Sequence, residues 1–302
     1  MTHTYQKTAH RSSLEILQEE AGAKKWWLSL PLAFLAIAAG SLISGALSQW
    51  LLLPSMTDAN RLLIGFVSLS VFLGSSLVLI LFVAKFWERR SLASFGLWKE
   101  KLGFNLLLGT ALGFFLVLLA VGFNLLGGQL HIQVEKQFNL GIWLFFLVNF
   151  FFQALAEEMI YRGFVMNKLR TKLSLLPAVL LNSLLFAVIH IFKGGTPVLY
   201  ILNVFLTGIF LSLLFALTDN LWLVTALHAA HNMIYLGVFG VIGAGNNLQH
   251  GSFLQTTLTS QANSFLAGTP SEPLSGGLIA VIVMALAALL TAYLAKKKQV
   301  FS

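Results

Sequence analysis

Eight long apolar runs follow one another along the chain, and they limit its fold more than any other feature. A helix needs about 20 apolar residues to cross the hydrocarbon core of a bilayer, where only helices and closed barrels satisfy every backbone polar group. The runs are too long, and alternate too little, to be barrel strands. We therefore predict an all-α fold, a polytopic transmembrane helix bundle of about eight spans, at roughly 27–53, 62–87, 103–127, 140–168, 175–193, 198–218, 221–243 and 274–295. The alternative is a six-span bundle in which two shorter runs do not cross the membrane.

Composition and charge agree with a membrane protein. The chain is 57% hydrophobic and 10% charged, whereas about a quarter of the residues of a soluble domain are charged. The positive residues behind the net charge of +8 are distributed according to the predicted membrane topology, which argues against a nucleic-acid partner. With the N-terminus inside, fifteen Lys and Arg residues fall in inner segments and three in outer ones, with Arg162 set aside. This bias predicts that both termini face the cytoplasm. The chain contains no cysteine, which excludes disulfides and thiolate sites.

The polar segments predict one integral-membrane domain over 1–302, without internal repeats. Residues 1–25 are expected to be a cytoplasmic tail. Because they lack the short apolar stretch of a signal peptide, the first helix is expected to act as an uncleaved signal anchor. Residues 244–273 form the longest polar connection and are predicted to be an outer loop. The stretch "SLASFGLWKEKL" (91–102) alternates apolar and basic residues, which predicts a helix on the inner membrane surface.

A few charged or titratable side chains lie at membrane depth, where a charge costs at least about 2.5–3.5 kcal/mol and usually marks a functional site. They are Glu157, Glu158, Arg162, His190, His228 and His231. Glu158 and Arg162 are four residues apart with the acid first, the better order for a helical ion pair. Glu157 points to another face and continues a polar line at four-residue steps, made of Asn149, Gln153, Glu157 and Tyr161. We expect Glu158 to be ionised and structural, and Glu157 to be available for proton chemistry. An ion pair that only locks this helix is an equally good interpretation of these residues alone.

The histidines lie on two later runs. His190 closes one of them and shares a helical face with Phe186. A single histidine in such a run is more often a core or interface residue, so His190 alone is weak support for function. His228 and Asn232 are four residues apart, share a face and can donate hydrogen bonds to one oxygen. His231 points elsewhere and is interpreted as packing or as a supporting partner.

Three segments on successive predicted helices together resemble one family. They are "EEMIYR" (157–162), "FAVIH" (186–190) and "HAAHN" (228–232). In this order they are similar to the motifs E-E-x-x-x-R, F-x-x-x-H and H-x-x-x-N of the CPBP family, the CAAX-protease and bacteriocin-processing (Abi) intramembrane proteases. The resemblance covers roughly 140–236, and it implies a protease core at about 140–243. Tyr161 and Ser212 depart from the family pattern, where phenylalanine and glycine are usual.

The resemblance implies an intramembrane endopeptidase that cleaves a membrane-associated protein or peptide. Glu157 and His190 would hold and activate a water, and His228 and Asn232 would form the oxyanion hole. The implied catalytic set is Glu157, Glu158, His190, His228 and Asn232, and the residues that shape the site are Arg162, Tyr161 and Phe186.

Zinc is the alternative chemistry, because Glu157, His190 and His228 could hold an ion with a water in the open position. However, the histidines lie on different helices and the chain has no H-E-x-x-H segment. We therefore expect a glutamate-activated water and no cofactor.

Other functions stay open at this stage. A non-catalytic bacteriocin-immunity or scaffold protein would have the same fold, although the intact motifs argue against it. A proton-coupled transporter could use buried Glu, His and Arg as a relay, but repeated halves are not visible. A structural subunit leaves the buried polar residues unexplained. The expected partners are membrane lipid and a membrane-associated substrate, the oligomeric state is open, and the expected location is a bacterial inner membrane.

Overall fold

The computed structural model describes residues 11–20, 26–51, 58–191, 197–241 and 251–300. Its long helices are α2 (Trp26–Leu51), α3 (Asp58–Phe82), α4 (Leu102–Leu126), α5 (Leu140–Glu158), α7 (Leu175–Ile191), α8 (Val198–Thr218), α9 (Leu221–Met233) and α11 (Leu278–Lys297). Seven helical segments are long and apolar enough to cross a membrane, and α7 is a shorter apolar helix. The prediction of an all-α polytopic membrane protein is confirmed, and the predicted runs match these elements one for one.

Short elements extend or connect the long ones. Three π-helices continue α3, α5 and α9, namely η2 (Val83–Trp87), η4 (Met159–Met166) and η5 (Ile234–Val238). The remaining helices are α1 (Ser13–Glu19), the 3-10 helix η3 (Leu92–Phe95), α6 (Asn167–Arg170) and α10 (Ser264–Ala267). Together α5, η4 and α6 form one continuous helical segment over Leu140–Arg170. The predicted fourth span is therefore present, but its residues Met159–Met166 are π-helical, which the sequence did not predict.

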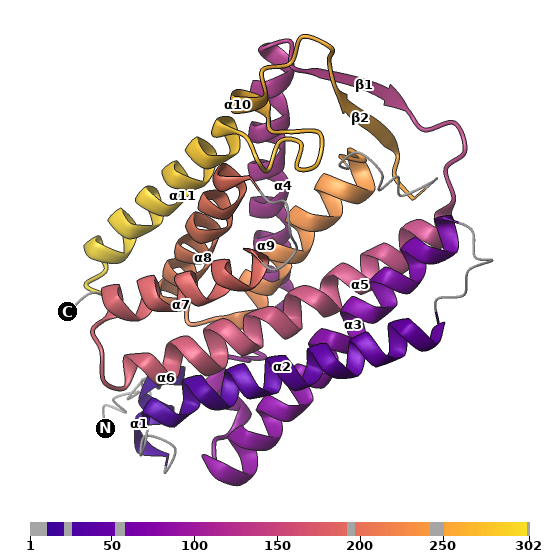
Figure 1. The fold of residues 1–302 in the computed structure, drawn as a ribbon. Coiled ribbons are helices and arrows are strands. Elements are labelled where there is room, and N and C mark those ends of the chain that lie inside the picture. The colour runs from indigo at the N-terminus through magenta and orange to yellow at the C-terminus, as the bar shows by residue number, and fades with distance from the viewer. Residues whose placement is uncertain (1–10, 21–25, 52–57, 192–196, 242–250, 301–302) are drawn as a thin grey trace, which may run out of the picture.

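Helix α9 lies at the centre of the bundle (Figure 1). In the apolar window of its segment, Leu221–Val238, 67% of the residues are buried, against 17% for the window in Leu30–Trp50 of α2. Helices α4 and α5 pack on α9, α8 packs between α7 and α11, and α2 pairs with α3 at the edge. A helix surrounded by protein can carry polar side chains that would be too costly against lipid. This position explains why α9 holds the "HAAHN" segment.

Helix α1 and the C-terminal end of α11 lie at the same end of the bundle (Figure 1). There α1 docks on the turn between α8 and α9, where the Asp219 carboxylate accepts hydrogen bonds from the backbone N–H of Ser13 (2.8 Å), from the Ser13 hydroxyl and from Trp98 Nε1 (3.1 Å). Burial raises the pKa of the Asp219 carboxyl above its ordinary 3.8, although these hydrogen bonds lower it. The turn between α8 and α9 carries no base in the sequence, and Ser13 and Trp98 donate to its acid instead.

Two connections differ from their predictions. The predicted interfacial helix over 91–102 is wrong, because helicity there is limited to η3, and Phe95 is 1% exposed in the core. The left-handed conformation of Gly96, with φ 77°, ends that single turn. At the other end of the bundle, β1 (Leu130–Val134) pairs antiparallel with β2 (Leu254–Leu258). The predicted outer loop over 244–273 thus contains β2 and α10, while its first residues, 244–250, lie outside the described residues.

Candidate active site

The first element of the site is a buried ion pair at the junction of α5 and η4. Arg162 Nη1 donates to Glu158 Oε1 at 3.0 Å, and both side chains are 0% exposed. Arg162 Nη2 also donates to the carbonyl of Gly208 on α8, at 3.3 Å. The predicted Glu158–Arg162 contact is confirmed, and it ties α5 to α8 as well as stabilising its own helix.

His228 on α9 reaches across to the same carboxylate. Its Nδ1 lies 2.8 Å from Glu158 Oε1. A carboxylate that is ionised by an adjacent guanidinium can only accept, so this contact places a proton on Nδ1 and turns Nε2 toward Glu157. The sequence predicted that His228 shares a helical face with Asn232. It did not predict the contact with Glu158, because His228 and Glu158 are 70 positions apart. Glu158 therefore orients an imidazole in addition to neutralising Arg162.

Glu157 lies on the neighbouring face of α5, where its carboxylate has different neighbours from the carboxylate of Glu158. Its Oε1 accepts a hydrogen bond from Gln153 Nε2 at 3.2 Å, one helical turn earlier. Its Oε2 lies 3.9 Å from Nε2 of His228, too far for a direct hydrogen bond. The whole residue is 6% exposed. The two adjacent glutamates thus differ as predicted, since Glu158 binds a cation directly and Glu157 faces the free edge of the imidazole.

Phe186 on α7 is the apolar centre around which the motif residues pack. Its ring lies edge-on to Tyr161 at 5.1 Å and to His228 at 6.4 Å, and the Arg162 guanidinium lies 4.8 Å from its centroid. His190 is one turn further along α7, with its ring 5.0 Å from that of Phe186. One large ring therefore contacts groups from η4, α7 and α9 and covers part of the Arg162 guanidinium.

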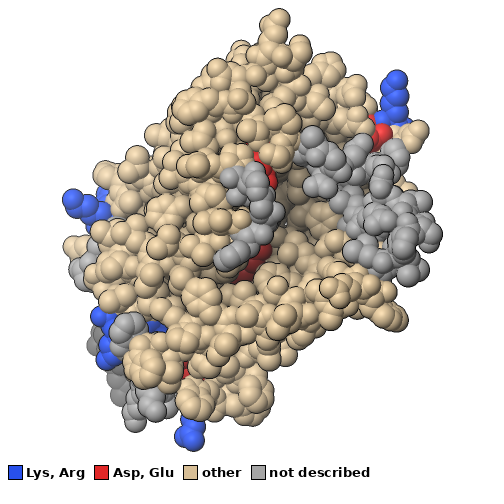
Figure 2. All heavy atoms as spheres, viewed as in Figure 1, with Lys and Arg blue, Asp and Glu red and all other residues tan. Residues whose placement is uncertain are grey.

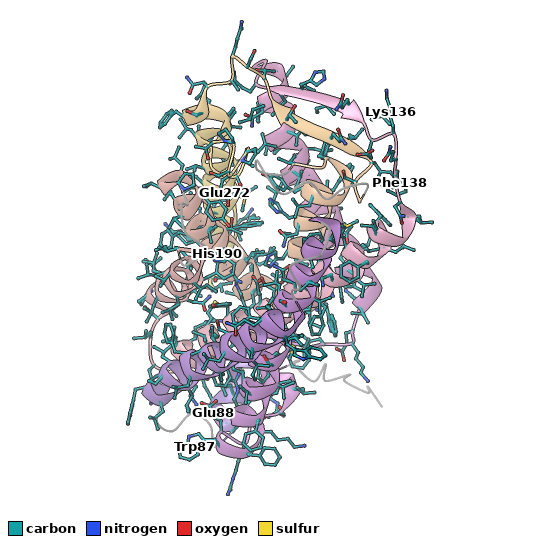
Figure 3. All side chains as sticks on the ribbon, turned by 45° about the vertical axis from the view of Figure 1, so that its right-hand side comes forward. Trp87, Glu88, Lys136, Phe138, His190 and Glu272 are labelled. Atoms are coloured by element: carbon teal, nitrogen blue, oxygen red, sulfur yellow. The ribbon has the colours of Figure 1, made fainter. Side chains whose placement is uncertain are left out.

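His190 is oriented by its own helix. Its Nδ1 lies 2.8 Å from the carbonyl oxygen of Phe186, so Nδ1 carries the proton and Nε2 is left as an acceptor. In Figure 3 His190 lies midway along the bundle, between Glu88 at one end and Lys136 at the other. The predicted meeting of His190 and Glu157 at one water stays a prediction.

Gly208 explains how α7 and α8 come close enough to form this site. A Cβ at this position would lie 2.9 Å from Ser183 Cβ and 3.0 Å from Ser183 Cα, so only glycine permits the observed approach. The same close approach brings the Gly208 carbonyl within reach of Arg162. At Ser212, where the family pattern has glycine, the hydroxyl instead accepts a hydrogen bond from Asn182 Nδ2 at 3.0 Å, which joins α7 and α8 by a polar contact.

Asn232 and His231 lie at the C-terminal end of α9. Asn232 Oδ1 is 3.5 Å from His231 Nδ1, and its predicted convergence with His228 stays a prediction. His231 points away from the glutamates, as predicted, and its ring stacks on Tyr235 with centroids 6.2 Å apart. Both rings line a small recess between α4, α8 and α11, together with Asn203 and Ser275.

The molecular surface is hollowed on the face shown in Figure 2. Acidic side chains are visible in this hollow, whereas the visible Lys and Arg side chains lie at the periphery. The zinc alternative requires Glu157, His190 and His228 to converge on one point. Within the described residues there is no group of three His, Cys, Asp or Glu side chains arranged to hold a metal ion. These side chains therefore do not fit the proposed ion, and no chemical step is assigned to a metal.

Fold and site together define a polytopic helical membrane protein with a buried carboxylate–imidazole centre. Residues 139–234 match the family model described as type II CAAX prenyl endopeptidase Rce1-like. The match runs from the N-cap of α5 to the end of α9 and includes all three motif segments. The resemblance to the CAAX-protease family is thereby confirmed for this part of the chain. Comparison with curated proteins found no match.

Proposed function

We propose that the chain is an intramembrane endopeptidase that hydrolyses a peptide bond of a membrane-associated protein or peptide, with Glu157 as the general base. One observation carries this proposal: the two adjacent glutamates flank one imidazole from opposite edges, at 2.8 Å and 3.9 Å. Glu158 is committed to Arg162 and His228, so Glu157 is the carboxylate that can take up and return a proton. The family match supports a protease in general.

The reaction starts when Glu157 takes a proton from a water held between its carboxylate and His190 Nε2. The water oxygen attacks the scissile carbonyl carbon, and the carbonyl electron pair moves to the oxygen. The oxyanion accepts hydrogen bonds from Nε2–H of His228 and from the Asn232 amide. For Nε2 to donate while Nδ1 donates to Glu158, the ring must carry two protons, and the two flanking carboxylates balance its charge. Glu157 then gives its proton to the leaving nitrogen as the C–N bond breaks, which yields a carboxyl group and an amine.

Cleavage is tested by comparing peptide and protein termini from cells that express wild type, Glu157→Gln or the exposed control Glu100→Gln at matched levels. Removing a general base costs about 10²–10⁴ in rate, so the new termini should be present with wild type and Glu100→Gln and absent with Glu157→Gln. The purified enzyme, reconstituted with the peptides found, should show the same order. Termini that persist in Glu157→Gln would refute its role as base. Profiles that do not differ from those of cells without the protein would favour the immunity or scaffold function.

We also propose that both termini face the cytoplasm of a bacterial cell. Most Lys and Arg residues fall in the segments that are cytoplasmic in this orientation, and α1 lies at the same end of the bundle as the C-terminal end of α11 (Figure 1). Because the chain has no cysteine, single cysteines at Lys99 and Lys136 can report sidedness without removing native thiols. A membrane-impermeant thiol reagent added to intact cells should label the second site and not the first. The opposite pattern would reverse the orientation.

A further inference from the structure

The π-helix η4 follows the catalytic glutamates directly and carries two of the residues that shape the site. It spans eight residues, whereas π-helical segments are usually single turns within an α-helix and often occur at functional sites. A shift of this segment to α-helical geometry would change its register and rotate the residues that follow by up to about 100°. Arg162 would then lose its position relative to α7 and α8, where its guanidinium lies 4.8 Å from the Phe186 centroid and donates to the Gly208 carbonyl. The π register therefore determines the geometry of the site.

Arg90, from the connection between α3 and α4, binds the backbone of this π-helix. Its Nη2 donates to the carbonyl of Gly163 at 2.7 Å, and its Nη1 to the carbonyl of Phe164 at 3.4 Å. The guanidinium also lies 4.5 Å from the ring centroid of Phe95 and 5.1 Å from that of Phe164. Arg90 is 6% exposed. A planar guanidinium can bind two successive carbonyls in one defined arrangement, so it recognises a backbone conformation as well as supplying charge.

Two further buried charged residues, Glu88 and Lys168, hold Arg90 and the end of η4 in place. Glu88 Oε2 lies 3.5 Å from Arg90 Nη1, and Glu88 Oε1 lies 3.0 Å from Lys168 Nζ on α6, immediately after η4. The side chain of Arg90 is 0% exposed, that of Glu88 4% and that of Lys168 1%. Figure 3 shows Glu88 at the opposite end of the bundle from Lys136 and well away from His190. Buried ion pairs add little net stability, so a structural specificity role is the better explanation of this cluster.

The apolar surface next to Arg90 fits the same turn. A Cβ on Gly163 would lie 2.6 Å from Phe95 Cδ1, so the backbone of η4 rests directly on the ring of Phe95. The connection between α3 and α4 thus offers a ring against Gly163 and hydrogen-bond donors to the carbonyls of Gly163 and Phe164. Both features select the observed backbone conformation over a regular α-helix.

We propose that Arg90 is a positioning residue that holds Met159–Met166 in its π-helical register, and thereby places Arg162 against Phe186 and the Gly208 carbonyl. The effect on catalysis rests on the proposed function, whereas the effect on the backbone does not. Glu88 and Lys168 support this role by fixing the guanidinium and the end of the helix.

The test compares Arg90→Lys with Arg89→Lys, its exposed neighbour, in the full-length protein. Lysine keeps the charge beside Glu88 but lacks the planar fork. If Arg90 selects the π register, hydrogen exchange of the peptides covering 159–166 should become faster in Arg90→Lys and stay unchanged in Arg89→Lys. Thermal stability should remain close to that of wild type, and kcat should fall by roughly 10- to 100-fold with little change in KM.

A purely charge-balancing role predicts instead that Arg90→Lys matches wild type in both exchange and kcat, and this result would overturn the proposal. If wild type shows no cleavage of any substrate, the proposed protease function fails, but the exchange measurement still decides the role of Arg90. A third variant, Arg90→Gln, removes the charge as well as the planar fork, and it should accelerate hydrogen exchange of 159–166 further. Hydrogen exchange at the wild-type rate in both Arg90 variants would also refute the inference.

Discussion

The Glu158–Arg162 pair offers the sharpest test of the site, because both side chains are fully buried. Arg162→Met keeps an unbranched apolar side chain and removes the guanidinium with its charge. The variant loses the 3.0 Å bond to Glu158, the 3.3 Å bond to the Gly208 carbonyl and the contact with Phe186 at 4.8 Å. It leaves a buried carboxylate without its guanidinium.

Breaking a buried ion pair by removing one partner costs about 3–5 kcal/mol. His228 still donates to Glu158 at 2.8 Å, so we expect the lower end, about 3 kcal/mol of unfolding free energy. The double variant Glu158→Gln with Arg162→Met removes both charges, and it should recover most of this loss while remaining inactive. Recovery of stability without recovery of activity would separate the structural role of the pair from its role in orienting His228.

The assay is reversible unfolding in mixed micelles, followed by tryptophan fluorescence, with Arg89→Met as an exposed control that should stay within about 1 kcal/mol of wild type. An Arg162→Met protein as stable as that control would refute the reasoning. It would mean that Glu158 is neutral or hydrated in the protein, and that the proton placed on His228 Nδ1 needs another explanation.

Three further predictions concern stability. The Tyr161 hydroxyl is buried and has no hydrogen-bond partner among the residues that the structure describes; Tyr161→Phe should therefore raise the unfolding free energy by about 1 kcal/mol, and a loss of that size would show that a partner exists. Gly208→Ala should cost about 1–3 kcal/mol because its Cβ meets Ser183 at 2.9 Å, whereas Gly122→Ala, with open space around it, should be neutral or slightly stabilising; equal effects of the two alanines would contradict the packing argument. Burial raises the pKa of the Asp219 carboxyl above 3.8, so the folded chain binds this proton more tightly than the unfolded chain, and the unfolding free energy should fall as pH rises from 3.8 through the folded value. Asp219→Asn should remove this part of the pH dependence, and identical pH profiles for the two proteins would refute it.

Sequence reasoning worked well wherever the information was local. Length and hydropathy of the apolar runs predicted the helices, because crossing a bilayer imposes one length and one composition on every span. Four-residue spacing predicted the contact between Glu158 and Arg162, since both lie on one helix. The same rule separated Glu157 from Glu158, and the structure gives these two carboxylates different partners. Local rules failed at 91–102, where alternating residues suggested a surface helix and Phe95 is instead buried in the core.

Contacts between distant segments were decided by the tertiary structure alone. The approach of His228 to Glu158, the central position of Phe186 and the contacts of Arg90 with η4 each join segments that no periodicity connects. They arise because α9 is surrounded by other helices, and because glycine at 208 lets α7 and α8 come close. The π-helical register of Met159–Met166 has the same origin, since its stabilising donors come from another part of the chain. The sequence by itself therefore determined which helices form and which polar residues they carry within the membrane. Only the packed bundle decided which of those residues meet, because side-chain contacts between helices depend on interhelical distance and rotation, which the pattern within one helix does not encode.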